Sequence, residues 1–132
     1  SINVETPILP SQVSFECRNT GTVDAPKWEL ASDVRRVDFE LRDINNNPLA
    51  AGSTLKAEAT GASIDTLSPN TVPNTNRIGG SQHSLFIKGE AGKCSSGGGV
   101  GQVRLTVQPV GGAERIYAFN VVYSAGGFSP GP

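Results

Sequence analysis

The chain has 132 residues, a length that fits one domain. Its composition of 36% hydrophobic and 17% charged residues, with 16 Gly, 9 Pro and no Met, favours short strands and tight turns over helices. The formal net charge of −1, without a cluster of Lys and Arg, argues against nucleic-acid binding. No apolar run approaches the roughly 20 residues of a membrane span, so no membrane insertion of this segment is expected. The chain opens at Ser1 without Met, and we expect a processed or excised segment.

The N-terminal part contains one regular strand pattern between two less regular segments. Residues 2–9 are interrupted by Pro7, which permits only an edge strand or an extended arm. Residues 12–17 alternate strictly between polar and apolar side chains, as a half-buried strand does. Residues 22–33 are ambiguous, because the apolar side chains around Trp28 fit either a short strand or a helical turn.

Further segments show the same alternation and predict strands with one face in the core. They cover residues 34–42, 54–60, 82–88, 102–109 and 116–123. Residues 61–81 are rich in Gly, Ser, Thr, Asn and Pro and predict a long connection, while residues 89–101 predict a flexible loop. Six or seven short strands separated by turns, with no amphipathic helix longer than a turn or two, predict a β-sandwich.

The two cysteines, Cys17 and Cys94, leave three interpretations open. They are too few and too far apart for a zinc site, and the chain has one histidine. A structural disulfide is favoured over a redox pair or two unpaired core thiols. In the chain-entropy model, a disulfide that closes a loop of this length stabilises the fold by roughly 4–5 kcal/mol. Such bonds persist in oxidising compartments, so we expect an extracellular, cell-surface or periplasmic location.

A distinctive turn joins two strands near the middle of the chain. The strand 37–41 ends in Arg42-Asp43-Ile44-Asn45-Asn46-Asn47-Pro48-Leu49 and continues into Ala50-Ala51-Gly52-Ser53-Thr54. Together with the closing strands 102–107 and 116–121, this motif resembles a bacterial immunoglobulin-like domain of the invasin/intimin type. Asn46 stands where that family often has Gly, which predicts a left-handed backbone at Asn46.

The resemblance implies an all-β, immunoglobulin-like β-sandwich of two antiparallel sheets with about seven strands over residues 34–123. Residues 1–33 are then an N-terminal extended segment packed on the sandwich, tied by Cys17 to the 89–101 loop, and residues 124–132 are a linker-like tail. The family also implies surface-exposed stalks, in which tandem modules space or present an adhesive tip. It carries no catalytic residues that transfer to this chain.

Two local motifs have the residue types of a binding loop without its spacing. The stretch 89–95 resembles a phosphate loop, but the intervals between its Gly, Lys and Ser residues do not match. Asp43, Asn45 and Asn47 match the first half of a calcium loop, whereas Pro48 stands where that loop needs Gly. These three residues are a weak metal candidate, and a β-turn explains them equally well.

No enzyme is predicted. His83, with Asp65 and nearby serines, has the residue types of a catalytic triad, but the chain has no nucleophile-elbow motif. No pair of carboxylates supports glycoside hydrolysis. Trp28, Tyr117 and Tyr123 are considered as a sugar-stacking platform. The strand alternation places both tyrosines with Phe119 in the core, so Trp28 is the candidate ligand contact.

The sequence therefore leads to three hypotheses, all without a cofactor. The first is a non-catalytic structural or adhesion module of a bacterial surface or secreted protein, which acts as a spacer or presenting module beside neighbouring domains of a longer surface protein. The second is a carbohydrate- or protein-binding module that uses loops 61–81 and 89–101 to contact a host or surface protein or glycan. The third is a pilus or phage-tail structural subunit.

Overall fold

The computed structural model describes residues 4–22, 24–31, 33–74, 78–95 and 99–125. These residues form eight strands and one short helix. In chain order the elements are β1 Gln12–Asn19, β2 Trp28–Leu30, β3 Val34–Leu41, β4 Thr54–Thr60, β5 Ala62–Ser68, β6 Ser81–Gly89, α1 Ala91–Ser95, β7 Gly99–Gln108 and β8 Arg115–Ala125. No helix in the described part of the chain is long and apolar enough to cross a membrane.

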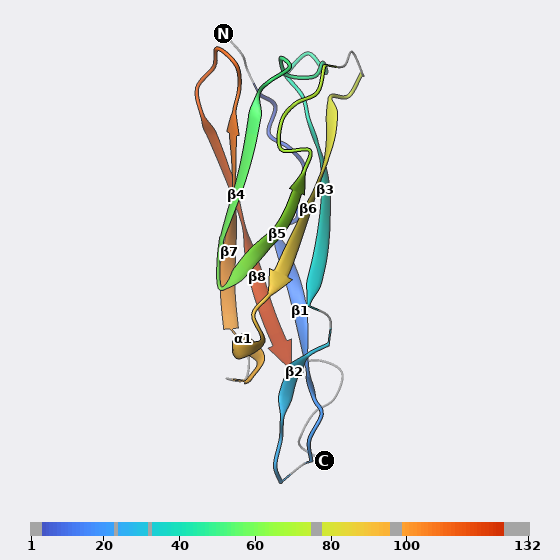
Figure 1. Cartoon of the computed structure of the whole chain (residues 1–132), viewed down its shortest axis with the longest axis vertical. Coiled ribbons are helices and arrows are strands. Elements are labelled where there is room, and N and C mark those ends of the chain that lie inside the picture. The colour runs from blue at the N-terminus through green and yellow to red at the C-terminus, as the bar shows by residue number, and fades with distance from the viewer. Residues whose placement is uncertain (1–3, 23, 32, 75–77, 96–98, 126–132) are drawn as a thin grey trace.

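The strands form two facing sheets (Figure 1). One sheet has the order β2-β1-β8-β7-β4 and the other the order β3-β6-β5. When the strands from β3 onward are lettered B to G, one sheet is B-E-D and the other contains C-F-G, which is the immunoglobulin arrangement. The predicted immunoglobulin-like β-sandwich is confirmed, with eight strands where about seven were expected.

One strand pairing differs from the expected antiparallel pattern. β1 pairs with β8 in parallel over six residue pairs, from Gln12↔Asn120 to Cys17↔Ala125. The arm before β1 explains this pairing, because Val4 forms a bridge with Asp43 at the end of β3 and the chain then crosses to the other sheet. β1 lies between β2 and β8, so this part of the predicted N-terminal segment is a hydrogen-bonded strand of the five-stranded sheet.

The two predicted connections contain regular structure. The segment 61–81 was expected to be a long connection, but residues 62–68 form β5 on the edge of the three-stranded sheet. A register shift between Ile64 and Thr66 interrupts the alternation, so the apolar residues of β5 do not follow a period of two. The predicted loop 89–101 holds α1 and the first residues of β7. Of the predicted tail 124–132, the last seven residues lie outside the described residues.

The core consists of the inward-facing side chains of both sheets. The faces predicted to be buried in β1, β3, β6, β7 and β8 are buried. Each fully buried Leu, Ile, Val or Phe stabilises the fold by about 1.5–3 kcal/mol relative to an exposed one. Residues in this core include Val13, Phe15, Cys17, Val37, Phe39, Leu41, Leu85, Ile87, Val103, Leu105, Val107, Phe119, Val121 and Tyr123.

The sandwich is elongated, and its two ends carry different elements (Figure 1). We call the end with residues 4–6 and the loops 42–53, 69–74 and 109–114 the N-terminal pole. The opposite end, the C-terminal pole, carries the tip of the β1–β2 hairpin, α1 and the end of β8. The first and last described residues therefore lie at opposite poles of the molecule.

Candidate functional site

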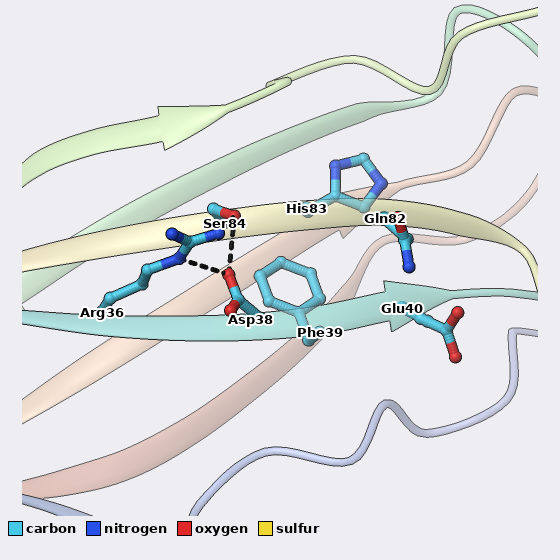
Figure 2. Close-up of a pocket in the computed structure, with 7 residues that line it drawn as sticks. All are labelled: Arg36, Asp38, Phe39, Glu40, Gln82, His83 and Ser84. Atoms are coloured by element: carbon cyan, nitrogen blue, oxygen red, sulfur yellow. Dashed lines mark hydrogen bonds and ion pairs between the residues drawn. The ribbon is translucent and has the colours of Figure 1, made fainter.

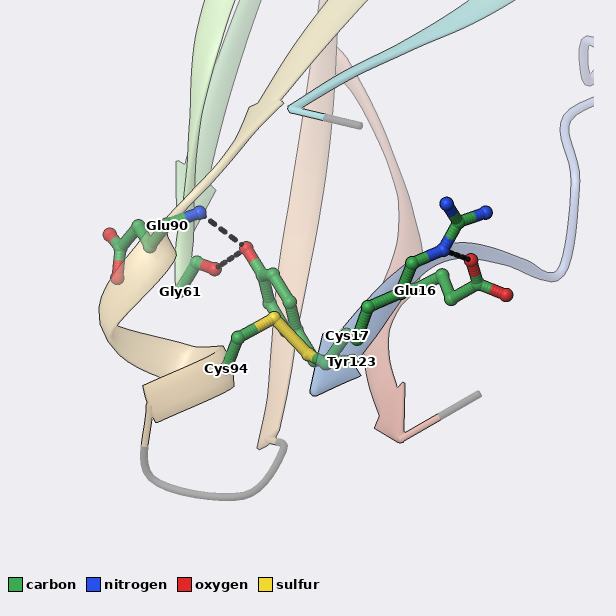
Figure 3. The surroundings of a disulfide bond; sticks show 7 residues. Glu16, Cys17, Gly61, Glu90, Cys94 and Tyr123 are labelled. Atoms are coloured by element: carbon green, nitrogen blue, oxygen red, sulfur yellow. Dashed lines mark hydrogen bonds and ion pairs between the residues drawn. A yellow bond between two sulfur atoms is a disulfide. The ribbon is translucent and has the colours of Figure 1, made fainter. Parts of the chain in front are cut away.

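A disulfide bond joins β1 to α1 at the C-terminal pole (Figure 3). Cys17 and Cys94 are both fully buried, and their Cα atoms lie 5.4 Å apart. Cys17 is paired with Leu30 of β2, so the bond attaches the β1–β2 hairpin to the segment that follows β6. The predicted link between the N-terminal segment and the 89–101 loop is present, and it fits an oxidising compartment.

The hydroxyl of Tyr123 fixes the same pole beside the disulfide (Figure 3). It donates a hydrogen bond to the carbonyl oxygen of Gly61 at 2.6 Å and accepts one from the backbone N–H of Glu90 at 2.9 Å. The ring stacks on Phe15, with the ring centroids 5.2 Å apart. Burial raises the pKa of Tyr123, so the hydroxyl keeps its proton and remains a donor at neutral pH. The turn between β4 and β5, the residue between β6 and α1, and β8 are thereby connected near Cys94.

The candidate ligand contact Trp28 lines a groove of about 740 Å³ at the C-terminal pole. One wall of the groove is β2 with the residues next to it, and the other wall is the start of α1. Trp28 is half-buried and packs against the core, so part of its ring surface remains open to the groove. The lining residues are Pro26, Lys27, Trp28, Glu29, Leu30, Asp33, Ala91 and Gly92. The disulfide holds the two walls together, which makes this groove the best-formed candidate binding site around Trp28.

The two loops assigned to a binding surface meet only at their starting residues, where Ala62 pairs with Gly89 and the Tyr123 hydroxyl joins Gly61 to Glu90. The part of 61–81 that follows β5 lies at the N-terminal pole, whereas α1, from the 89–101 loop, lies at the C-terminal pole (Figure 1). Only the second of these loops borders the groove of Trp28. A binding site that uses both loops would have to lie where Gly61 and Ala62 meet the 89–101 segment, because the part of 61–81 after β5 is at the other pole.

Asp43, the first residue of the weak calcium candidate, organises a turn. Its Oδ1 accepts the backbone N–H groups of Asn45 at 2.8 Å and Asn47 at 3.0 Å. Asn46 has φ of 68°, the left-handed conformation predicted at this position. In the described part of the chain no group of three or more His, Cys, Asp or Glu side chains is placed to hold a metal ion. The hydrogen bonds of this turn explain the choice of Asp and Asn without an ion.

His83, considered as part of a triad, lies in the core between Ser81 and Pro69. Its Nδ1 is 2.8 Å from the carbonyl oxygen of Pro69, which can only accept, so Nδ1 carries the proton. Nε2 then accepts a hydrogen bond from the hydroxyl of Ser81 at 2.6 Å. Both ring nitrogens are occupied, which leaves none for Asp65. Because His83 and Ser81 are each 2% exposed, this pair is closed to a substrate.

A shallow hollow of about 270 Å³ lies over β3 and β6 above His83 (Figure 2). Its polar side chains bind one another, since Asp38 accepts hydrogen bonds from Ser84 at 2.6 Å and from the Nε of Arg36 at 2.8 Å. These two hydrogen bonds, with Ser84 the stronger contributor, lower the pKa of Asp38. Alternating charges on an edge strand such as β3 are typical of a surface that resists pairing with another chain.

The sequence interpretation missed two arrangements at these sites. Nothing in the strand pattern indicates that the hydroxyl of Tyr123 connects Gly61, before β5, to Glu90, before α1, because these partners are backbone groups far away in the chain. The Ser81–His83 pair was also missed. Its signal was a period of two, which places Ser81 and His83 on the same inward face as Leu85.

No protein-family model matches the chain, and no curated protein matches it. Several solved structures do match over nearly its whole length. The periplasmic chaperone SfaE is 9% identical with a TM-score of 0.51, and the alignment covers 93% of this chain and 58% of SfaE. The E. coli chaperone DraB is 9% identical with a TM-score of 0.53 and coverages of 92% and 55%. The chaperone YadV is 11% identical with a TM-score of 0.53 and coverages of 92% and 52%.

At these identities the likeness concerns the fold alone. The chain spans little more than half the length of each of these chaperones. The structural likeness supports an immunoglobulin-like β-sandwich and does not distinguish the invasin/intimin type from other branches of that fold.

Proposed function

We propose that this chain is a non-catalytic spacer or presenting module of a bacterial surface or secreted protein, and that it carries tension between its two ends. The observation behind the proposal is the parallel pairing of β1 with β8, the first and last strands of the chain. Neighbouring domains of a longer protein are the partners this role requires. Its setting would be extracellular, at the cell surface or periplasmic, where a disulfide persists.

The direction of the two strands determines how they meet a pulling force. β1 and β8 both run from the N-terminal to the C-terminal pole (Figure 1). Tension on the ends pulls β1 toward the first pole and β8 toward the second, so the two strands slide past each other. The hydrogen bonds of all six residue pairs then share the load instead of breaking one after another. This arrangement resists extension better than a hairpin that opens from its end.

The disulfide limits extension after the strands have separated. Cys17 and Cys94 are 77 positions apart, and the covalent bond between them transmits the force without extending the residues in between. β2 to β6 lie within that closed loop. Under force, only the residues outside the disulfide-closed loop can extend. The residues between Cys17 and Cys94 add no length, even after the sandwich has unfolded.

Single-molecule force spectroscopy of the chain between two identical handle domains tests this proposal. Extension of the closed loop at about 3.5 Å per residue predicts that reduction lengthens the unfolded chain by about 270 Å. The oxidised chain should unfold at a higher force when pulled by its ends than when pulled across the β7–β8 hairpin. Equal forces in the two geometries would contradict a tension-carrying role, whatever the gain in length.

A second candidate function is binding of a carbohydrate or protein at the Trp28 groove, which we favour over the other loops because of its volume and its disulfide-held walls. The open part of the half-buried Trp28 ring, in a groove that Asp33 also lines, suits stacking against a sugar whose hydroxyls reach a carboxylate. A glycan array with the intact chain and the Trp28→Ala and Trp28→Phe variants is the test. Binding that survives in Trp28→Phe and is lost in Trp28→Ala would support this function, and equal array profiles for all three would count against it.

A further inference from the structure

The first half of β8 has a free edge at the N-terminal pole. β8 begins at Arg115 and pairs with β7 from Arg115 to Tyr123, but β1 joins its other side only at Asn120. Between residues 115 and 119, β7 is the one strand neighbour of β8 in the described part of the chain. The arm that precedes β1 does not close this edge, because Val4 pairs with Asp43 of the facing sheet.

The direction of the backbone groups at this edge follows from one hydrogen bond. The N–H of Asn120 points to the β1 side, where it donates to the carbonyl oxygen of Ser11 at 3.4 Å. Backbone groups of a strand alternate in direction from one residue to the next. Ile116 and Ala118 therefore direct their N–H and C=O groups to the free edge, and the residues between them pair with β7.

A groove of about 560 Å³ lies along this edge, and its walls combine aliphatic with polar and charged side chains. β8 and the residue before it form one wall, and the N-terminal arm with the turn after β3 forms the other. The lining residues are Val4, Thr6, Ile44, Glu114, Arg115, Ile116 and Tyr117. Ile44 is 61% exposed and Ile116 is 48% exposed, which is unusual for large aliphatic side chains that lie so close together.

We propose that this groove binds an extended segment of a partner protein, which adds as a strand to the free edge of β8. Strand addition explains both features of the site, since main-chain hydrogen bonds provide affinity and the side-chain walls select the sequence. The segment would span about five residues, facing positions 115–119, and would direct aliphatic side chains toward Ile44 and Ile116. One acidic and one basic residue, Glu114 and Arg115, stand at the same end of the groove, which suits a segment without net charge.

The shape of the groove favours a single segment over a second copy of this chain. The described edge strands of the sandwich are backed by a sheet and by a second layer. The N-terminal arm walls the groove opposite β8, so a strand that carries a sheet behind it would meet the arm as it approaches. A volume of this size matches that of small-ligand and peptide sites. The inference does not depend on the mechanical role proposed above.

Amide hydrogen exchange measured by NMR is the direct test. The intact, oxidised chain is labelled with ¹⁵N and titrated with a blocked pentapeptide of alternating Val and Thr. Without peptide, the amides of Ile116 and Ala118 should exchange at least tenfold faster than the amide of Tyr117, which faces β7. With peptide, their exchange should slow and shift changes should centre on residues 115–119 and Ile44. Slow exchange in the free chain would overturn the proposal, because the edge would already be paired.

Variants separate the edge from its surroundings. Ala118→Pro removes an N–H that faces the free edge and should weaken peptide binding at least tenfold while the β7–β8 pairing persists. Ile116→Lys should weaken binding as well and guards against misfolding of the proline variant. Val100→Lys is the matched control, since Val100 is 69% exposed near the opposite pole and should leave binding unchanged.

Two further outcomes would overturn the proposal. Unaltered binding in both Ala118→Pro and Ile116→Lys would place the peptide elsewhere. Concentration-dependent self-association in light scattering, lost in Ile116→Lys, would show that a second copy occupies the groove. That outcome would favour the pilus or phage-tail subunit hypothesis instead.

Discussion

The buried imidazole of His83 makes the stability of this protein depend on pH. Burial lowers the pKa of His83 from its ordinary 6.5, and the hydrogen bond to the Pro69 carbonyl only partly offsets this effect. The unfolded chain therefore takes up a proton at a higher pH than the folded chain. The stability that the neutral ring contributes is fully present above pH 6.5 and is lost as the pH falls toward the lower pKa of the folded state. Urea unfolding at pH 7.5, 6.5 and 5.5 should show a midpoint that declines over this range.

The variant His83→Gln is the control for this prediction. His83 is the one histidine of the chain, so no other side chain has its ordinary pKa between 5 and 7. His83→Gln should lower stability at pH 7.5 and flatten the decline between pH 6.5 and 5.5. An equally steep decline in His83→Gln would mean that another group titrates in this range.

The Tyr123 hydroxyl predicts a second effect at the scale of one residue. Tyr123→Phe removes two part-buried hydrogen bonds, to the carbonyl of Gly61 and from the N–H of Glu90, and each contributes about 0.5–1.5 kcal/mol. Tyr117→Phe, on the same strand and only half-buried, should change the free energy of unfolding by less than about 0.5 kcal/mol. Urea denaturation of both variants measures the difference. Equal losses in the two variants would show that the hydroxyl of Tyr123 does not connect the pole.

Local chemistry was predictable at the residue scale, and long-range partners were not. The left-handed backbone of Asn46 follows from its position in a turn of Asp and Asn residues, because the hydrogen bonds that require it lie within five positions. The partner of the Tyr123 hydroxyl, Gly61, is 62 positions away, and no neighbour in the sequence indicates it. The same distance argument explains why the carbonyl partner of His83 was missed.

Alternation identified the strands whose registers are regular. β3 and β6 pair over eight consecutive positions without a shift, and their buried residues follow a period of two. β5 was missed because its bulge between Ile64 and Thr66 changes which residues face inward halfway along the strand. Turn-forming residues on both sides of β5 reinforced the expectation of a connection. A single extra residue was therefore enough to conceal one of eight strands.

The two halves of β8 should respond differently to the same substitution. Val122 and Ala118 both point their N–H groups away from β7, but only Val122 faces β1. Val122→Pro removes a hydrogen bond inside the sheet and should cost about 1–3 kcal/mol. Ala118→Pro removes an N–H that meets solvent and should cost less than about 1 kcal/mol. Thermal unfolding compares the variants, and a larger loss in Ala118→Pro would contradict the assignment of the free edge.

The parallel pairing of β1 and β8 is the feature of the whole molecule that the sequence did not indicate. A strand pattern reports which face is buried, and it contains no information about the direction of a neighbouring strand. The prolines of the arm were correctly associated with an edge or an extended segment. The arm pairs with one sheet at Val4 and with the other at Gln12. This crossing could not be predicted from the prolines, because it depends on the positions of both sheets. The parallel β1–β8 pairing, on which the proposed tension-carrying role rests, is therefore visible only in the assembled fold.

The disulfide should account for a large share of the stability of the whole domain. With 77 positions between Cys17 and Cys94, the chain-entropy model gives roughly 4–5 kcal/mol. Domains of this size have total stabilities of about 5–15 kcal/mol, so the Cys17→Ser, Cys94→Ser double variant should be only marginally folded.

Urea unfolding of the double variant, beside the reduced and the oxidised natural chain, measures this contribution. The reduced chain and the double variant should coincide, because both lose the same covalent closure, and both should fall well below the oxidised chain. The β1–β2 hairpin and α1 should lose amide protection first, since the bond is their main attachment to each other at the C-terminal pole. A double variant as stable as the oxidised chain would mean that packing alone fixes this pole, and the tension-carrying role would then rest on the β1–β8 pairing alone.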